Sequence, residues 1–222
     1  MDYWPIIIGL IPSFAWLYFY LGEDPHPEPK KLVFEAFLLG SITTFLAFYI
    51  QKAFGVGLSQ IGASNYSPAA FFIFSAVEEL LKFGAAFILV KSSSRYFDEP
   101  VDAMIYIVVV ALGFAAVENV AAAINSQGAS FEITTLRFIG ATLLHTISSA
   151  IIGYYWAISI ISHNIKKLIA GCFLAILLHA IFNYLIIRYE PALMVPTGFL
   201  IIAAMVVLYD FEKLKYIYEP RQ

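Results

Sequence analysis

Charged side chains are scarce in this sequence of 222 residues, since Asp, Glu, Lys and Arg together make up 13% of it. Soluble domains carry about 25% charged residues and roughly 45–50% apolar ones, whereas the hydrophobic share here is 61%. These values exclude a water-soluble globule and a disordered chain. The net charge of −3 excludes a nucleic-acid partner, which needs a basic face. The single cysteine, Cys172, excludes an intramolecular disulfide.

Long uncharged runs are abundant. Four of them contain no Asp, Glu, Lys or Arg and are 20, 28, 20 and 19 residues long: Tyr3–Gly22, Phe138–Ile165, Leu168–Ile187 and Pro191–Tyr209. A helix needs about 20 residues to cross a bilayer, and a segment in lipid must be helical because an open strand edge finds no water there. The sequence therefore predicts an all-α, polytopic transmembrane bundle in a single domain, residues 1–222. About seven spans are expected: Tyr3–Leu21, Leu32–Ile50, Pro68–Val90, Ala103–Ile124, Ile133–Ile160, Leu168–Ile187 and Ala192–Tyr209.

The basic residues predict the orientation of these spans. Nine Lys and Arg fall in the first, third and fifth loops and the C-terminal tail, against three in the N-terminus and the even loops. Cytoplasmic loops carry the excess of basic residues. We therefore expect a multi-pass protein of the cell membrane with its N-terminus outside and its C-terminus in the cytoplasm.

Ionisable groups inside the expected spans form a short set: Glu78, Glu79, Lys82, Glu118, His145 and His179. Each costs at least about 2.5–3.5 kcal/mol to insert, which makes it a functional candidate. Glu78, Glu118 and the two histidines lie roughly 10–18 Å below the outer edge at about 1.5 Å per residue. Four helices of alternating direction therefore carry their costly groups at one depth, which predicts a common buried cluster.

Helical spacing gives each group a neighbour. Glu78 and Lys82 are spaced i,i+4, in the order that favours an ion pair. Lys82 is expected to neutralise Glu78 and leave Glu79 free, with the reverse assignment close behind. The remaining groups have hydrogen-bonding neighbours: Ser149 one turn after His145, Asn183 one turn after His179, and Asn119 directly after Glu118.

Five sets of residues follow one another in order between residues 78 and 183: Glu78-Glu79-Leu80-Leu81-Lys82, Phe97-Asp98-Glu99-Pro100-Val101-Asp102, Gly113-Phe114-Ala115-Ala116-Val117-Glu118-Asn119, His145 with Ser149, and His179 with Asn183. This ordered set resembles the PrsW-type intramembrane proteases, bacterial enzymes that make the first cut in membrane-bound anti-sigma factors. The resemblance covers about half of the chain. It implies a catalytic core of about residues 68–187, a bacterial membrane, and a single-span substrate of the anti-sigma-factor type.

The chain resembles, more distantly, the CAAX prenyl endopeptidases and their bacteriocin-immunity relatives. Their sites combine a Glu pair, a Phe-x-x-x-His motif and a His-x-x-x-Asn motif. Here Glu118 stands where the first histidine of that pattern is expected, while His179 and Asn183 keep the last motif. A prenylated substrate therefore does not follow from this resemblance.

Peptide hydrolysis needs an activated water, a stabiliser of the oxyanion and an acid for the leaving amine. The candidate catalytic residues are Glu78, Glu79, Glu118, His145, His179 and Asn183, supported by Lys82, Asn119 and Ser149. In a metal-free version, Glu78 or Glu79 is the general base, His179 and Asn183 bind the oxyanion, and His145 donates or orients a proton.

In the second version a divalent metal such as zinc is bound by two histidines and a carboxylate, and another Glu is the base. The candidate metal ligands are Glu79, Glu118, His145 and His179. No His-Glu-x-x-His spacing is present, and both versions stay open at this point. Two functions from other classes also remain: a scaffold or immunity-type protein that binds a transmembrane peptide, and a proton-coupled transporter.

Overall fold

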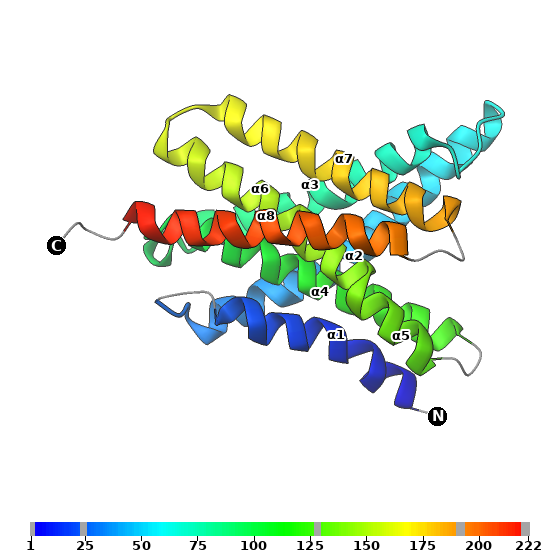
Figure 1. Ribbon diagram of the computed structural model, residues 1–222, viewed down its shortest axis with the longest axis horizontal. Helices are drawn as coiled ribbons and strands as arrows, with labels where there is room; N and C mark the ends of the chain where they lie inside the picture. Colours follow the sequence, from blue (N-terminus) through cyan, green and yellow to red (C-terminus); the bar gives the residue numbers. More distant parts are fainter. Residues whose placement is uncertain (1–2, 23–25, 127–129, 190–193, 219–222) are drawn as a thin grey trace.

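The computed structural model describes residues 3–22, 26–126, 130–189 and 194–218, and within these ranges it contains helices and no β-strand. The helices in chain order are α1 (Trp4–Leu21), α2 (Lys30–Gln60), α3 (Pro68–Ser92), the 3₁₀ turn η1 (Ser94–Tyr96), α4 (Asp102–Asn125), α5 (Ser130–Ile139), α6 (Ala141–Ile161), α7 (Ile165–Arg188) and α8 (Met194–Tyr218). The long helices run roughly along the long axis of the molecule (Figure 1). The expected all-α, polytopic bundle is confirmed.

Six segments of the described chain are long and apolar enough to cross a membrane: α1, α2, α4, Thr134–Ile161, α7 and Met194–Leu214. The remaining long helix, α3, has 25 residues, but every stretch of 18 within it contains Glu78, Glu79 and Lys82. Charged groups in lipid are costly unless they face protein or water. The bundle buries these three side chains of α3, and the protein is a multi-pass membrane protein.

Two expected spans differ in detail from the structure. The span expected over Ile133–Ile160 is interrupted at Gly140 (φ −96°, ψ −92°), which separates the short α5 from α6. Helix α2, expected to end at Ile50, continues to Gln60 and has 31 residues. At about 1.5 Å per residue it is roughly 46 Å long, whereas the hydrocarbon core is about 30 Å thick. The turn between α2 and α3 accordingly protrudes at the end of the bundle where the N-terminus lies (Figure 1).

Helix α4 lies at the centre of the bundle and contacts α1, α2, α3, α5 and α6. Every residue from Asp102 to Ala116 is buried. A Cβ at Gly113 would be 1.9 Å from the Phe37 carbonyl oxygen, and one at Gly40 would be 1.9 Å from that of Val110. Small residues allow membrane helices to approach this closely. The contact fixes the part of α2 that leads to the polar cluster against the part of α4 that carries Glu118.

Candidate active site

Three side chains from three different helices meet inside the bundle. One ligand atom from each of Glu78 (α3), His145 (α6) and His179 (α7) lies within 4.8 Å of the others. The three residues are buried, with relative exposures of 8%, 3% and 2%. Oxygen Oε2 of Glu78 lies 3.6 Å from Nε2 of His179 and 3.9 Å from Nδ1 of His145. The groups that the sequence placed at one depth are thus in one cluster.

Each imidazole is oriented by a second carboxylate on its other side. His145 Nε2 lies 2.8 Å from Glu118 Oε2, and His179 Nδ1 lies 2.7 Å from Glu79 Oε1. An ionised carboxylate only accepts hydrogen bonds, so in both contacts the ring nitrogen is the donor. In the neutral rings, His145 Nδ1 and His179 Nε2 therefore carry lone pairs on the side where Glu78 lies.

Lys82 pairs with Glu79 and not with Glu78, so the favoured assignment from the sequence is wrong and the reverse one is correct. Its Nζ lies 2.5 Å from Glu79 Oε1, and both side chains are completely buried. The Glu79 carboxylate also accepts hydrogen bonds from Ser148 Oγ (2.8 Å) and Ser149 Oγ (3.1 Å) of α6. Glu79 faces α6 together with Lys82, and this shared direction explains the pairing.

Lys82 also reaches the cluster of ligand atoms. Its Nζ lies 3.1 Å from His145 Nδ1. Because an ammonium only donates hydrogen bonds, this contact fixes the same tautomer of His145 as the contact with Glu118 does. The Lys82 ammonium thus pairs with the Glu79 carboxylate and donates a hydrogen bond to the lone pair of His145 Nδ1.

Glu118 and Asn119 form a second polar group with Arg137 of α5. Arg137 donates from Nε to Asn119 Oδ1 at 2.7 Å and from a terminal nitrogen to Glu118 Oε2 at 3.1 Å. Asn119 in turn donates to Thr142 Oγ1 at 2.9 Å. The side chains of Glu118 and Arg137 are 29% and 25% exposed, which makes this edge of the cluster the more open one. A cavity of about 300 Å³ between α2 and α4 is lined in part by Glu118.

Glu78 has one bonded oxygen and one without a partner. Gln51 of α2 donates from Nε2 to Glu78 Oε1 at 2.7 Å. Oxygen Oε2 is buried and accepts no hydrogen bond from the described residues. An unsatisfied buried carboxylate oxygen is costly, and this one is the atom that faces the two imidazoles. The arrangement fits a bound cation, because two histidines and one carboxylate form a common catalytic zinc set.

The separations also fit a metal. Zinc bonds of about 2.0–2.2 Å require donor atoms roughly 3–4 Å apart, and the two distances from Glu78 Oε2 are 3.6 and 3.9 Å. The sequence had proposed Glu79 and Glu118 as carboxylate ligands. In the structure these two bind the outer nitrogens of the histidines, an arrangement that orients metal-binding imidazoles in many sites.

One candidate lies beside the cluster, and several contacts were not foreseen. Asn183 is half-buried, one turn after His179 on α7, and it has no side-chain hydrogen bond to any residue that the structure describes. The sequence reasoning missed the hydrogen-bonding partners of the cluster: Gln51, Arg137, Thr142 and Ser148. Of these, Arg137 could have been found from the sequence. It directly precedes the uncharged run Phe138–Ile165 and has no acidic residue three or four positions away, so its charge needs a partner on another helix.

Comparison with known proteins gives one consistent result. Residues 28–209 match the family described as "PrsW family intramembrane metalloprotease". A protein named Protease PrsW from Geobacillus kaustophilus is 30% identical over 190 residues, 83% of this chain and 80% of that protein. The proteins of the same name from Oceanobacillus iheyensis and Bacillus subtilis are 27% identical over 92% of this chain and 93% of theirs, and 31% identical over 68% and 66%. No solved structure matches this chain.

The family match spans most of the chain and includes every residue of the cluster. The family consists of proteases, so the chain is a hydrolase that cuts a membrane protein within the bilayer. The buried group of two imidazoles and a carboxylate agrees with the description of the family as metalloproteases. This protein belongs to the PrsW family of intramembrane metalloproteases.

Proposed function

We propose that this protein is a zinc-type intramembrane endopeptidase whose cation is bound by Glu78, His145 and His179. The observation that carries the proposal is the unpartnered, buried Oε2 of Glu78, which faces the lone-pair side of both imidazoles. A bound divalent cation supplies Lewis-acid chemistry, by polarising the peptide carbonyl and making water more acidic. Glu78 replaces Glu79 and Glu118 as the carboxylate ligand in this proposal.

Glu79 and Glu118, which are not metal ligands in this proposal, have different roles. Glu79 fixes His179 and neutralises Lys82, and its complete burial keeps it away from substrate. Glu118 fixes His145 through Oε2, while Oε1 has no described partner and the residue lines the cavity between α2 and α4. Glu118 Oε1 is therefore the proposed proton acceptor for the attacking water, because a general base must reach the proton that it removes.

Lys82 sets a condition on cation binding. Its ammonium occupies the lone pair of His145 Nδ1, which is one of the proposed ligand atoms. Cation binding therefore requires the Lys82 contact with His145 to break, while the contact with Glu79 can remain. Asn183 stays a candidate oxyanion donor, since it lies one turn after His179 and its amide is uncommitted among the described residues.

We further propose a single-span substrate of the anti-sigma-factor type, and a topology with the N-terminus outside and the C-terminus in the cytoplasm. The substrate class rests on the family resemblance, and the topology rests on the nine basic residues on one side against three on the other. In this orientation the cluster lies in the outer half of the membrane. The single domain 1–222 and its core at 68–187 remain predictions.

The test combines elemental analysis with a cleavage assay on the full chain. The protein is purified in detergent, its metal content is measured, and it is then incubated with a purified, doubly tagged single-span protein of the anti-sigma type. We expect about one zinc per chain, cleavage that stops with a strong chelator, and loss of both properties in Glu78→Gln. The control Glu35→Gln changes a carboxylate that is 39% exposed and whose ion pair among the described residues is with Lys31 at 3.7 Å. Cleavage by metal-free protein in the presence of chelator would favour the metal-free version instead.

A further inference from the structure

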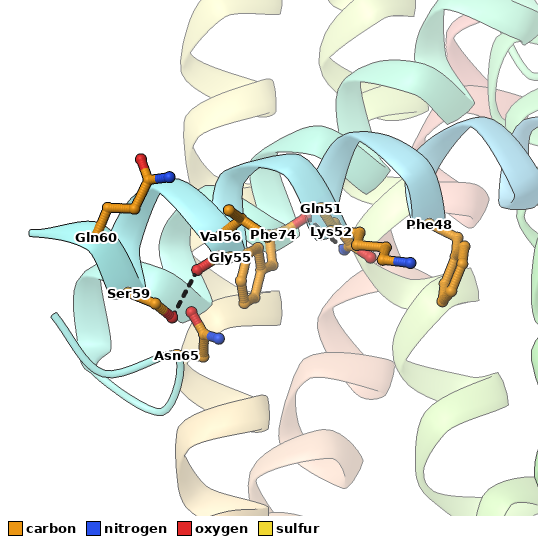
Figure 2. A pocket seen from close by; sticks show the side chains of 9 residues that line it. All are labelled: Phe48, Gln51, Lys52, Gly55, Val56, Ser59, Gln60, Asn65 and Phe74. Carbon is orange, nitrogen blue, oxygen red and sulfur yellow. Dashed lines mark hydrogen bonds between the residues drawn. The ribbon is translucent and has the colours of Figure 1, made fainter. Parts of the chain in front are cut away.

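Two cavities follow one another along α2. The larger, about 650 Å³, is lined by α2 residues from Phe48 to Gln60, by Asn65 in the turn that follows, and by Phe74 of α3. Figure 2 shows these side chains along one side of α2, with Asn65 approaching from the turn. The smaller, about 300 Å³, lies between α2 and α4. Phe48 and Gln51 line both cavities, so the two are direct neighbours that meet at these side chains.

Gln51 connects this pair of cavities to the catalytic cluster. It donates from Nε2 to Glu78 Oε1 at 2.7 Å and to the Phe74 carbonyl oxygen at 3.2 Å. Glu118, the proposed proton acceptor, lines the smaller cavity. A polypeptide that passes from one cavity to the other therefore passes Gln51 and reaches Glu118.

Both cavities have a mainly apolar surface, and they differ in the polar groups among their lining residues. The larger one offers amide and hydroxyl groups, and Lys52 is the one charged residue among those that line it. It extends from Gln51, which bonds Glu78, to Asn65 in the turn between α2 and α3, so it leads from the level of the cluster toward the end of α2. In the smaller cavity Glu118 is the one charged lining residue, beside apolar side chains such as Phe45, Phe114 and Val117. The apolar surface suits apolar side chains of a substrate, and the polar groups along it can bond an extended peptide backbone.

We propose that the two cavities form one substrate groove, in which the larger cavity binds an extended, acidic segment just outside the membrane span of the substrate. The inference rests on the proposed function and names the site that this substrate occupies. Binding sites usually measure about 300–1,000 Å³, and both cavities fall within this range. Lys52 selects a carboxylate at this position, and Gln51 guides the adjoining backbone toward Glu78 and Glu118.

The steric part of the proposal is tested with two leucine substitutions on one helix. A Cβ at Gly55 would lie 3.4 Å from Asn65 Nδ2, so the side chain of Gly55→Leu extends into the larger cavity. A Cβ at Gly57 would have nothing within 4 Å, which makes Gly57→Leu the matched control. The probe is a synthetic peptide with six acidic and polar residues followed by a leucine-rich span, and its binding to the full chain is measured in nanodiscs.

The binding is measured with chelator present, and mass spectrometry verifies that the peptide stays intact. We expect Gly55→Leu to raise the Kd about tenfold or more, as a loss of 1.4 kcal/mol does, while Gly57→Leu keeps the wild-type value. Equal Kd values for the two variants, or no binding to the wild type, would overturn the groove. Normal binding without cleavage when metal is restored would instead contradict the proposed function.

The charge part is tested by an exchange between protein and peptide. Lys52→Glu is expected to raise the Kd of the acidic peptide about threefold to tenfold, because exposed ion pairs contribute roughly 0.2–1 kcal/mol and the exchange adds repulsion. A peptide with lysines at the acidic positions should show the opposite preference. Lys31→Glu, at the opposite end of α2, is the control and should change neither Kd. If the Lys52→Glu protein binds both peptides with the wild-type Kd, Lys52 does not contact the bound peptide.

Discussion

The substitution Glu118→Gln distinguishes two contributions to the proposed metal site: the orientation of His145 by its outer hydrogen bond, and the bond between His145 and the metal. Glu118 accepts the Nε2–H of His145 at 2.8 Å and thereby directs Nδ1 toward Glu78. A glutamine keeps a carbonyl oxygen that can accept this bond, but the charge is lost. Hydrogen bonds to charged groups contribute about 1.5–3 kcal/mol, and loss of such an outer contact typically costs about 10–100-fold in metal affinity. We therefore expect zinc to bind Glu118→Gln about 10–100-fold more weakly, which equals about 1.4–2.7 kcal/mol.

The affinity is measured on purified protein in detergent, by competition for zinc with a chromophoric chelator. Glu78→Gln, which removes a proposed ligand, should bind more weakly than Glu118→Gln, and Glu35→Gln should match the wild type. Thermal unfolding of each metal-free variant verifies that the bundle is intact, which is expected because the Glu118 side chain is 29% exposed. An affinity of Glu118→Gln equal to that of the Glu35→Gln control refutes the reasoning. A wild type that binds no zinc refutes the whole metal site.

Three further predictions concern stability and metal. Lys82→Met leaves the carboxylate of Glu79 without its buried cation and should lower the free energy of unfolding by about 3–5 kcal/mol, seen as a lower Tm. The double variant Lys82→Met with Glu79→Gln should recover part of this loss. If the losses of the two single variants simply add in the double variant, the two residues do not stabilise the fold as a pair. Gly113→Ala would place a Cβ 1.9 Å from the carbonyl oxygen of Phe37 and should cost about 1–3 kcal/mol, whereas Gly84→Ala, with nothing within 4 Å, should unfold like the wild type. Bound zinc should raise the Tm in proportion to the logarithm of its concentration above Kd, and chelator should reverse the rise; a Tm independent of zinc contradicts the site.

The sequence was informative about the fold because membrane insertion leaves few alternatives. Uncharged runs of about 20 residues predict helices directly, and the depth of the ionisable groups predicted their meeting. The break at Gly140 was not predicted, because the sequence from Phe138 to Ile165 contains none of the charges that usually mark the end of a span. The length of α2 was missed because the glycine-rich stretch after Ile50 is a poor helix sequence, which contacts with α3 stabilise.

The partners within the site were less predictable than its members. Spacing along one helix indicates which side chains share a face, but not toward which neighbour that face is turned. For this reason Lys82 was first assigned to Glu78, although α6 draws it toward Glu79 and His145. Gln51 directly follows one expected span and Arg137 lies in the first turns of another, and their contacts with Glu78 and Glu118 join residues 27 and 19 positions apart.

The buried carboxylate of Glu79 joins three helices, because it bonds Lys82 on its own α3, two serines on α6 and His179 on α7. These helices enter the membrane in that order during synthesis, and the last histidine arrives about one hundred residues after the glutamate. A chain in which α7 is not yet in place therefore lacks His179, one of the three proposed ligands. If these three residues bind the cation as proposed, cleavage requires that α7 has packed against α3 and α6.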